Sequence, residues 1–295
     1  CEHGRILCRR FFNCYKILLM YVATYNDGNT TINPYVEVPI SLPDMPPEEE
    51  MFNYGLPQEE QVWRPVVMPK GFRQLPWQKQ KTIADEMWHR RRNGEWWLIN
   101  GEPTYLTGTA FLFFNFWHIA NKTLPTFKIQ CVWWFQVLRA VELDNDCFGV
   151  VEVKPRRAHS TEMSLCWGWD MVTKFRDSKF GIMSKGDGDA ELAFDRLVFG
   201  AMRMHQIFKP KNTGSDRPQA QLEYQYPARR IGSTNVVEVL DEKTPELHSK
   251  AWFEPTVEGK FDGEKLRAML FDEIGKIPTS KMDVTYQWDV VRECM

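Results

Sequence analysis

The sequence lacks the cysteine patterns of metal-binding and disulfide-rich proteins. Its seven cysteines are scattered, with no CxxC pair and no Cys/His spacing typical of a metal site, which favours a reducing compartment. It also lacks an uninterrupted apolar run long enough to cross a bilayer. Asn13 and Lys16 interrupt the most apolar early segment, residues 11–23, and no small-residue cleavage site follows it. We therefore expect a short helix or strand there rather than a signal peptide, and no membrane partner.

An excess of basic residues is absent as well. The formal net charge is −2, so no overall basic field argues for nucleic-acid binding. Contacts with DNA would have to come from local clusters at residues 90–92, 154–157 and 229–230, each of which could equally be a solvated face. A hydrophobic content of 43% excludes a globally disordered chain. The first residue is Cys1 rather than Met, so we expect the chain to be a fragment or to lack its true start.

The first third of the chain divides by composition. Prolines and acidic residues dominate residues 24–61 and predict an extended linker, so we expect an N-terminal extension over 1–61 and one domain over 62–295. Residues 75–93 predict a helix that stops at Asn93-Gly94. The aromatic-rich residues 95–119 predict a hairpin followed by a helix, with rings more typical of a core than of base stacking. A further helix is expected over 127–143, with a buried face made of Trp133, Trp134, Val137 and Leu138.

After residue 147 the pattern is strand, loop, helix, strand, helix. The segments are a β-branched strand at 148–153, a basic loop at 154–160, a helix from about Thr161 to 176 and a strand at 179–184. A helix over 189–204 follows, with an apolar face of Leu192, Ala193, Leu197, Val198 and Met202. A loop is expected over residues 208–220, and a helix over residues 283–292. Between them, short strands are expected at residues 221–228, 235–240 and 250–255. This alternation is typical of an α/β fold with a mostly parallel sheet flanked by helices.

A short apolar run ends in two adjacent carboxylates, Asp272 and Glu273, within residues 266–276. Periodicity alone cannot separate a buried strand from a helix segment over such a length. A parallel strand would deliver both acids to the edge of the sheet at which open α/β folds bind ligands. The competing interpretation is a strand that leaves the core into solvent. In nucleoside-triphosphate hydrolases the first acid of such a pair serves Mg²⁺ and the second acts on the attacking water.

The strand–loop–helix at 148–165 has the arrangement of a phosphate loop, in which backbone N–H groups cradle phosphate. Thr161 would lie near the helix start, where a hydroxyl can cap the helix or reach Mg²⁺. The usual pattern GxxxxGK[ST] is degenerate here. No glycine lies between Lys154 and Thr161, and Ser160 occupies the lysine position, so the available cations are Lys154, Arg156 and Arg157.

The order of these motifs resembles the N-terminal ATPase region of large terminase subunits, the DNA-packaging motors of tailed phages. The resemblance is nearest to the divergent terminases of large-genome phages that infect gut Bacteroidetes. It covers about residues 65–295 and implies a RecA-like, ASCE-type P-loop NTPase fold preceded by an aromatic-rich extension. The residues that carry it are Leu75-Pro-Trp-Gln-Lys-Gln, the stretch 93–108, Val153-Lys-Pro-Arg-Arg, Phe261-Asp-Gly-Glu-Lys-Leu and Phe271-Asp-Glu-Ile-Gly-Lys.

The resemblance implies roles for individual residues in ATP hydrolysis with Mg²⁺. Asp272 and Thr161 would hold Mg²⁺, and Glu273 would serve the catalytic water. Gln78 or Gln80 would recognise adenine. The remaining phosphate-loop residues would bind ATP, with Arg157 also assisting catalysis; they are Lys154, Arg156, Arg157, His159 and Ser160.

One position departs from the family. His159 stands where related chains usually have glycine, and its Cβ would move the backbone away from the phosphates or impose strain at positive φ. A catalytically weak nucleotide-binding or docking module of the same fold is therefore one alternative. A helicase-type translocase that acts on nucleic acid is another.

The resemblance also implies the partners and the setting. These are double-stranded viral DNA, the portal protein, the small terminase subunit and further copies of the chain in a ring, in the cytoplasm of the host cell. The motor would move viral DNA into the prohead through contacts with the phosphate backbone, which do not read sequence. Family members carry a C-terminal nuclease domain, which we expect to be absent from these 295 residues.

Overall fold

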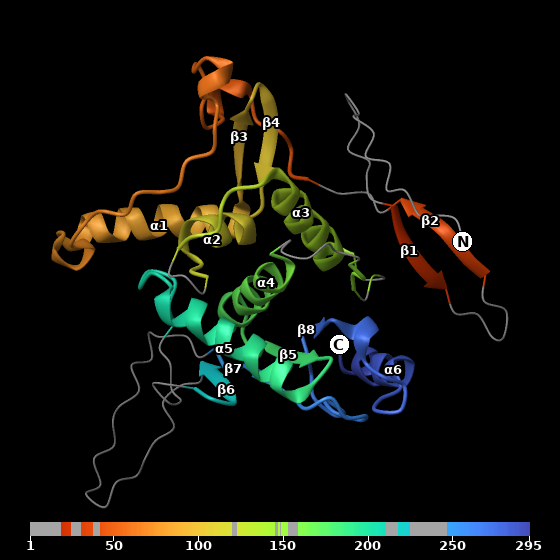
Figure 1. The fold of residues 1–295 in the computed structure, drawn as a ribbon. Coiled ribbons are helices and arrows are strands. Elements are labelled where there is room, and N and C mark those ends of the chain that lie inside the picture. The colour runs from red at the N-terminus through yellow and green to blue at the C-terminus, as the bar shows by residue number, and fades with distance from the viewer. Residues whose placement is uncertain are drawn as a thin grey trace, which may run out of the picture. The chain divides into compact units, whose positions relative to one another are not determined.

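The computed structural model describes residues 19–24, 31–37, 42–119, 123–144, 147, 149–152, 159–210, 218–224 and 247–295. These residues form an α/β fold that divides into two compact units (Figure 1). The first unit comprises residues 1–64, 94–107 and 128–153, and the second comprises residues 65–93, 108–127 and 154–295. The division differs from the single boundary expected at residue 61, because residues 94–107 and 128–153 group with the first unit.

The first unit contains two antiparallel hairpins and one long helix. Strand β1 (Leu19–Thr24) pairs with β2 (Thr31–Glu37), and β3 (Glu95–Ile99) pairs with β4 (Glu102–Leu106). The short 3₁₀ helices η1 (Glu48–Glu50) and η2 (Gln58–Glu60) precede helix α3 (Ile129–Leu143). The prediction of a linker over 24–61 is wrong for β2, which forms a strand. Whether a segment forms a strand depends on the strand with which it pairs, and composition does not reveal that pairing.

The turn residues and the cross-strand aromatic side chains explain why β3 and β4 form a hairpin. Asn100 and Gly101 both have positive φ, 51° and 82°, which suits the two-residue turns that match the twist of paired strands. Trp96 of β3 packs against Tyr105 of β4 with ring centroids 5.3 Å apart. The predicted hairpin is therefore confirmed.

Helix α3 is also confirmed, and its expected buried face is confirmed at Val137 and Leu138 but not at Trp133 or Trp134. The side chain of Trp133 is 45% exposed, whereas Val132 and Phe135 are buried. Residues three apart share a face of a helix, so burial of Val132 and Phe135 turns the intervening Trp133 outward. Aromatic character alone did not identify the buried stripe.

The sheet of the second unit has the order β6-β7-β5-β8. Strand β5 (Lys179–Ser184) lies parallel to β7 (Ser249–Phe253) and to β8 (Ala268–Asp272), while β6 (Gln221–Tyr224) is antiparallel to β7. The strands expected at 179–184, 250–255 and 266–273 are confirmed within one or two residues. Of the strand expected at 221–228 the structure describes only β6, and the strand expected at 235–240 lies outside the described residues.

Helices cover both faces of this sheet (Figure 1). Helices α4 (Ser160–Lys174) and α5 (Asp187–Arg203) pack on the face to which Phe180 points, and a Cβ on Gly168 of α4 would come 2.2 Å from that ring. Because side chains alternate along a strand, Gly181 faces the other side, where Phe261 approaches it. Helix α6 (Val284–Cys294) packs on that second face through Val291. Asp283 caps α6 by accepting hydrogen bonds from the N–H groups of Thr285 and Tyr286.

Two further expectations are wrong: a strand in the first unit and the burial of Leu192 in α5. The strand expected at 148–153 is not formed at the described residues 149–152, where Val151 is 79% exposed. A β-branched run is stable as a strand only when it is paired and packed, and β5 is the only partner of β8 in the described sheet. In α5 the confirmed helix turns Leu192, 50% exposed, outward and buries Phe194 instead.

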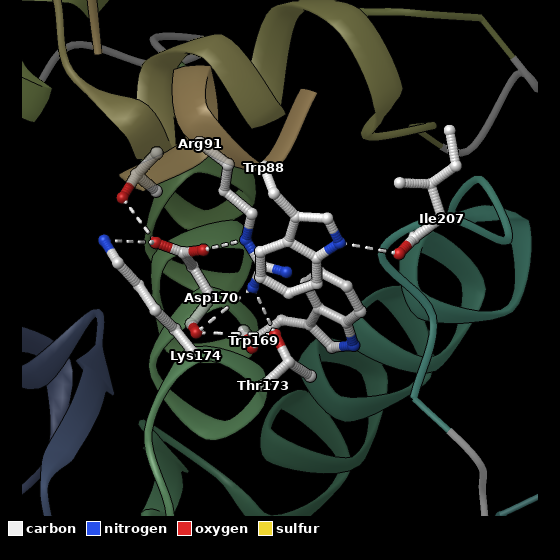
Figure 2. Close-up of polar contacts among 8 residues, drawn as sticks. Trp88, Arg91, Trp169, Asp170, Thr173, Lys174 and Ile207 are labelled. Atoms are coloured by element: carbon white, nitrogen blue, oxygen red, sulfur yellow. Dashed lines mark hydrogen bonds and ion pairs between the residues drawn. The ribbon is translucent and has the colours of Figure 1, made fainter. Parts of the chain in front are cut away.

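Helices α1 (Trp77–Asn93) and α2 (Gly108–Phe116) form a further layer against α4, and η3 (Phe72–Gln74) precedes α1. A buried ion pair joins α1 to α4 (Figure 2). Arg91 Nε lies 2.8 Å from Asp170 Oδ1, and both side chains are fully excluded from solvent. The guanidinium lies 4.7 Å from the ring centroid of Trp88 and 5.3 Å from that of Trp169.

This ion pair corrects the interpretation of residues 90–92 as a DNA-contacting or solvated basic cluster. Arg90 is buried over the ring of Phe111, and Arg91 is buried against Asp170. Arg92 alone of the three is exposed. A row of three arginines on a helix points in three directions, because successive residues are about 100° apart.

The close approach of α1 and α2 makes Gly108 sensitive to substitution. A Cβ there would come 1.7 Å from the carbonyl oxygen of Arg91. We expect Gly108→Ala to lower the free energy of unfolding by about 1–3 kcal/mol, because the backbone of α1 would have to move. Gly188→Ala in α5 is the matched control, since its Cβ would meet nothing within 4 Å. That variant should gain up to about 1 kcal/mol from helix propensity. Urea unfolding of both variants measures the difference, and equal stabilities would contradict the expected clash.

Candidate nucleotide site at the carboxyl ends of β5 and β8

The two acids predicted to leave a buried strand lie at the end of β8. Asp272 is the last residue of the strand and Glu273 follows it. Asp272 is in register with Ser184, the last residue of β5, and Ser184 Oγ donates a hydrogen bond of 3.2 Å to the backbone oxygen of Asp272. The carboxyl ends of two parallel strands therefore meet here, at the edge where α/β sheets bind ligands.

The N-terminus of α4 reaches the same point. Thr161, in the first turn of α4, places its Oγ1 3.2 Å from both Oδ1 and Oδ2 of Asp272. The hydroxyl donates to the carboxylate across 111 residues of sequence. The structure thus brings together the two residues that the resemblance assigns to Mg²⁺, and it does so where the first N–H groups of a helix point outward and favour anions.

His159 adopts the conformation that glycine would take most easily. Its φ is 62° and its ψ is 9°, in the left-handed region, directly before the first residue of α4. Left-handed geometry costs a residue with a Cβ roughly 1–2 kcal/mol. The expectation of a positive φ at this position is confirmed. The same sign of φ occurs at Glu273, with φ 55° and ψ 32°.

Two lysines surround the carboxylate of Glu273. Lys185 Nζ lies 2.5 Å from Glu273 Oε2, and Lys276 Nζ lies 2.7 Å from Oε1. The hydrogen bond from Lys185, followed by that from Lys276, lowers the pKa of Glu273 to about 2. The hydrogen bond to Glu273 in turn raises the pKa of Lys185. Glu273 is consequently fully ionised at neutral pH.

Sequence reasoning missed Lys185. It directly follows β5, so the rule that placed Asp272 at the ligand-binding edge would have placed Lys185 beside it. The rule was applied to the acids alone.

A small cavity near the start of α4 was missed as well. It has a volume of about 180 Å³ and is lined by His118, Glu162, Asp195, Arg196 and Phe199. Burial raises the pKa of Glu162, whose Oε2 accepts a hydrogen bond of 3.3 Å from Trp117 Nε1.

Of the remaining predicted site residues, the structure describes Ser160, Gln78 and Gln80. Lys154, Arg156 and Arg157 lie outside the described residues. Ser160 is the buried first residue of α4. Gln78 is exposed on the first turn of α1, where its backbone oxygen accepts a hydrogen bond from Thr82.

In the first turn of α1, Gln80 Nε2 donates a hydrogen bond of 2.7 Å to the carbonyl oxygen of Leu75, just before the helix. That end of α1 follows Phe72, whose ring packs against His205, just beyond the C-terminal end of α5. Helix α5 begins beside the carboxyl ends of the strands and extends toward their amino ends. Its 17 residues, at 1.5 Å each, give it a length of about 25 Å. The structure therefore does not bring Gln80 to Asp272.

The donor set fits a nucleotide-bound Mg²⁺ better than a metal held by protein alone. Among the described residues, no group of three or more His, Cys, Asp or Glu side chains could hold a metal ion. Mg²⁺ at phosphate sites usually takes only one or two protein oxygens and completes its shell with phosphate and water. Thr161 Oγ1 and the Asp272 carboxylate supply two such oxygens.

Comparisons with family models, with curated proteins and with solved structures found no match. None of the helices in the described part of the chain combines the length and the apolar character needed to cross a bilayer.

Proposed function

We propose that this chain carries the ATP-hydrolysing part of a phage DNA-packaging motor. The observation that supports the proposal is the contact between Thr161 and Asp272 at the carboxyl end of β8, with Glu273 next to it. A hydroxyl at a helix start and an acid at a strand end are the two protein ligands that P-loop NTPases use for Mg²⁺. Their convergence follows from folding, since 111 residues separate them.

In the proposed reaction, each residue has a distinct role. Thr161 and Asp272 hold Mg²⁺, which when bound offsets charge on the phosphate oxygens. The N–H groups of the first turn of α4 bind phosphate. Glu273 orients the attacking water. The proposed cations for the phosphates are Lys154, Arg156 and Arg157.

The proposal extends to the setting implied by the resemblance. The motor would act on double-stranded viral DNA in the host cytoplasm, with the portal protein, the small terminase subunit and further copies of the chain as partners. Such a RecA-like ATPase would drive DNA through contacts with the phosphate backbone, which are independent of sequence.

A catalytically weak module of the same fold is the second candidate. Two observations favour it: His159 holds a left-handed conformation with a Cβ attached, and lysines bond both oxygens of Glu273. Such a module would bind nucleotide poorly and release no phosphate. Phosphate release measured beside mant-ATP binding distinguishes the candidates, because only a motor releases phosphate. If the strain at His159 limits binding, His159→Gly should bind nucleotide more tightly.

Nucleotide binding is tested by titrating the protein with fluorescent mant-ATP, with Mg²⁺ or with EDTA. We expect Mg²⁺-dependent binding, and we expect Asp272→Asn to weaken it about tenfold or more, since the variant loses one charged contact of about 1.4 kcal/mol. Asp85→Asn, an exposed acid on α1 paired with Lys81, is the matched control and should bind as the wild type does. Absence of binding, or equal affinity of Asp272→Asn and wild type, would overturn the proposal.

A further inference from the structure

Residues 51–62 of the first unit are hydrogen-bonded to strand β3 and form a fixed surface beside it. The N–H group of Phe52 donates to the backbone oxygen of Trp96 at 3.0 Å, and the backbone oxygen of Phe52 accepts from the N–H group of Leu98 at 2.9 Å. Asn53 Nδ2 donates to the backbone oxygen of Leu98 at 3.1 Å. Because these bonds fix the backbone, the side chains that point to solvent keep their places on the surface.

Two exposed aromatic side chains lie on this segment among carboxylates. Tyr54 is 51% exposed, and Phe52, whose ring centroid lies 4.7 Å from that of Trp97, is 41% exposed. The sequence has no lysine or arginine between residues 17 and 63. Exposed carboxylates precede and follow the two rings, at Asp44, Glu48, Glu49, Glu50, Glu59 and Glu60. Residues 44–62 therefore form an acidic surface with exposed rings.

The next stretch of the chain has the opposite charge. Residues 61–84 contain no aspartate or glutamate. The cations before and at the start of α1 are exposed, at Arg64, Lys70, Arg73 and Lys79. Trp77 is 73% exposed, although tryptophan is a highly buried residue on average, and Val67 is exposed as well. Residues 64–79 therefore form a basic surface with exposed apolar side chains.

The two surfaces complement each other. Within the described part of the chain, none of the carboxylates of the acidic surface takes part in an ion pair. The acidic surface would repel the phosphates of a nucleic acid, so its occupant is a protein that supplies cations and apolar side chains. Protein interfaces combine buried aromatic anchors with a charged rim, and the basic surface of this same chain supplies both.

We propose that the acidic surface of one copy of this chain docks on the basic surface of a second copy. The two surfaces differ, so the contact is head-to-tail, and each copy can contact one neighbour through each surface. Tyr54 and Trp77 provide apolar contacts, and the carboxylates pair with the cations of residues 64–79. The inference rests on the proposed function in one respect, because that function calls for further copies of the chain as partners.

The test is sedimentation velocity of the full 295-residue chain without nucleotide, at about 1–100 μM. We expect self-association, and we expect salt to weaken it about tenfold or more between about 50 and about 500 mM NaCl, because salt screens the charges. Two triple variants reverse one surface each. The acid-reversed variant carries Glu48→Lys, Glu49→Lys and Glu50→Lys, and the base-reversed variant carries Lys70→Glu, Arg73→Glu and Lys79→Glu.

Each reversed variant alone should associate about tenfold or more weakly than the wild type, because like charges then face each other. An equimolar mixture of the two should associate within about threefold of the wild type, since every surface in the mixture again finds one of opposite charge. A wild type that stays monomeric over the whole range, a reversed variant that associates as the wild type does, or a mixture that stays monomeric would each overturn the proposal.

Tyr54→Ser changes no charge and tests the apolar contact separately. It should weaken association about threefold to tenfold, whereas Tyr286→Ser should leave it unchanged, because Tyr286 is 52% exposed on α6 and lies on neither surface. Equal effects of the two variants would contradict a contact at Tyr54. Binding of mant-ATP is measured independently of association, so failure of the associating wild type to bind it would overturn the proposed function and not the interface.

Discussion

Glu273→Gln is expected to abolish most ATP hydrolysis and to leave ATP binding within about twofold of wild type. The amide keeps the shape of the side chain but cannot act as a carboxylate acceptor for the attacking water, a role that contributes about 10²–10⁴-fold to a rate. Glu273 contacts Lys185 and Lys276, whereas the contact that carries the proposed Mg²⁺ site belongs to Asp272 and Thr161. Loss of Glu273 should therefore affect the rate of hydrolysis, whereas loss of the neighbouring Asp272 should affect nucleotide binding.

Phosphate release under saturating ATP measures the first quantity, and mant-ATP titration with Mg²⁺ measures the second. Glu191→Gln is the matched control, because Glu191 is an exposed acid on α5. A Glu273→Gln variant that hydrolyses ATP at the wild-type rate would remove Glu273 from the proposed mechanism. Loss of binding in that variant would show instead that Glu273 contributes to nucleotide affinity.

The elements that sequence patterns predicted well are those with both a period and a stop signal. Helix α1 ends at Asn93 before Gly94, and α6 begins after the capping residue Asp283. Strand β8 was predicted from an apolar run that ends in acids. Elements that depend on a partner were harder, since propensity alone does not show whether β2 or residues 149–152 find a partner strand.

The candidate site was predictable where a single topological rule was sufficient. The rule that parallel strands deliver their carboxyl ends to the ligand-binding edge places Asp272 and Glu273 there. The pairing of Asp272 with Thr161 is implied by the resemblance, and the structure shows their contact. The adenine-recognising role of Gln78 or Gln80 is implied by the resemblance alone, and it stays a prediction. Positive φ at His159 was one of two outcomes suggested by the glycine that related chains usually have there, and φ is 62°.

The buried ion pair between α1 and α4 makes the second unit sensitive to the loss of either partner. Asp170 accepts hydrogen bonds from Arg91 Nε at 2.8 Å and from Thr109 Oγ1 at 2.8 Å, and Lys174 Nζ lies 3.8 Å from its Oδ2 (Figure 2). Burial by itself would raise the pKa of Asp170, but the charges of Arg91 and Lys174 outweigh it and the net pKa is lowered. Removing one partner of such a pair leaves an uncompensated charge in the interior.

Asp170→Ala is accordingly expected to lower the free energy of unfolding by about 3–5 kcal/mol. Urea unfolding measures this loss. Asp85→Ala is the control: it breaks the exposed pair with Lys81 and should cost at most about 1 kcal/mol. The double variant Arg91→Met/Asp170→Leu removes both charges and should recover most of the loss. Equal stabilities of Asp170→Ala and Asp85→Ala would contradict a stabilising role for the buried pair.

The ion pair between Arg91 and Asp170 also predicts how stability changes at acidic pH. Because the pKa of Asp170 is lower in the folded protein than in the unfolded chain, its ionised form contributes stability at every pH above the unfolded value. That contribution is lost as the pH falls through the folded-state pKa, since protonation leaves Arg91 without its counter-charge. Wild-type stability should therefore decline between the unfolded pKa of about 3.9 and the lower folded value. In Asp170→Ala this component of the decline should be missing, and urea midpoints measured across the acidic range test the difference.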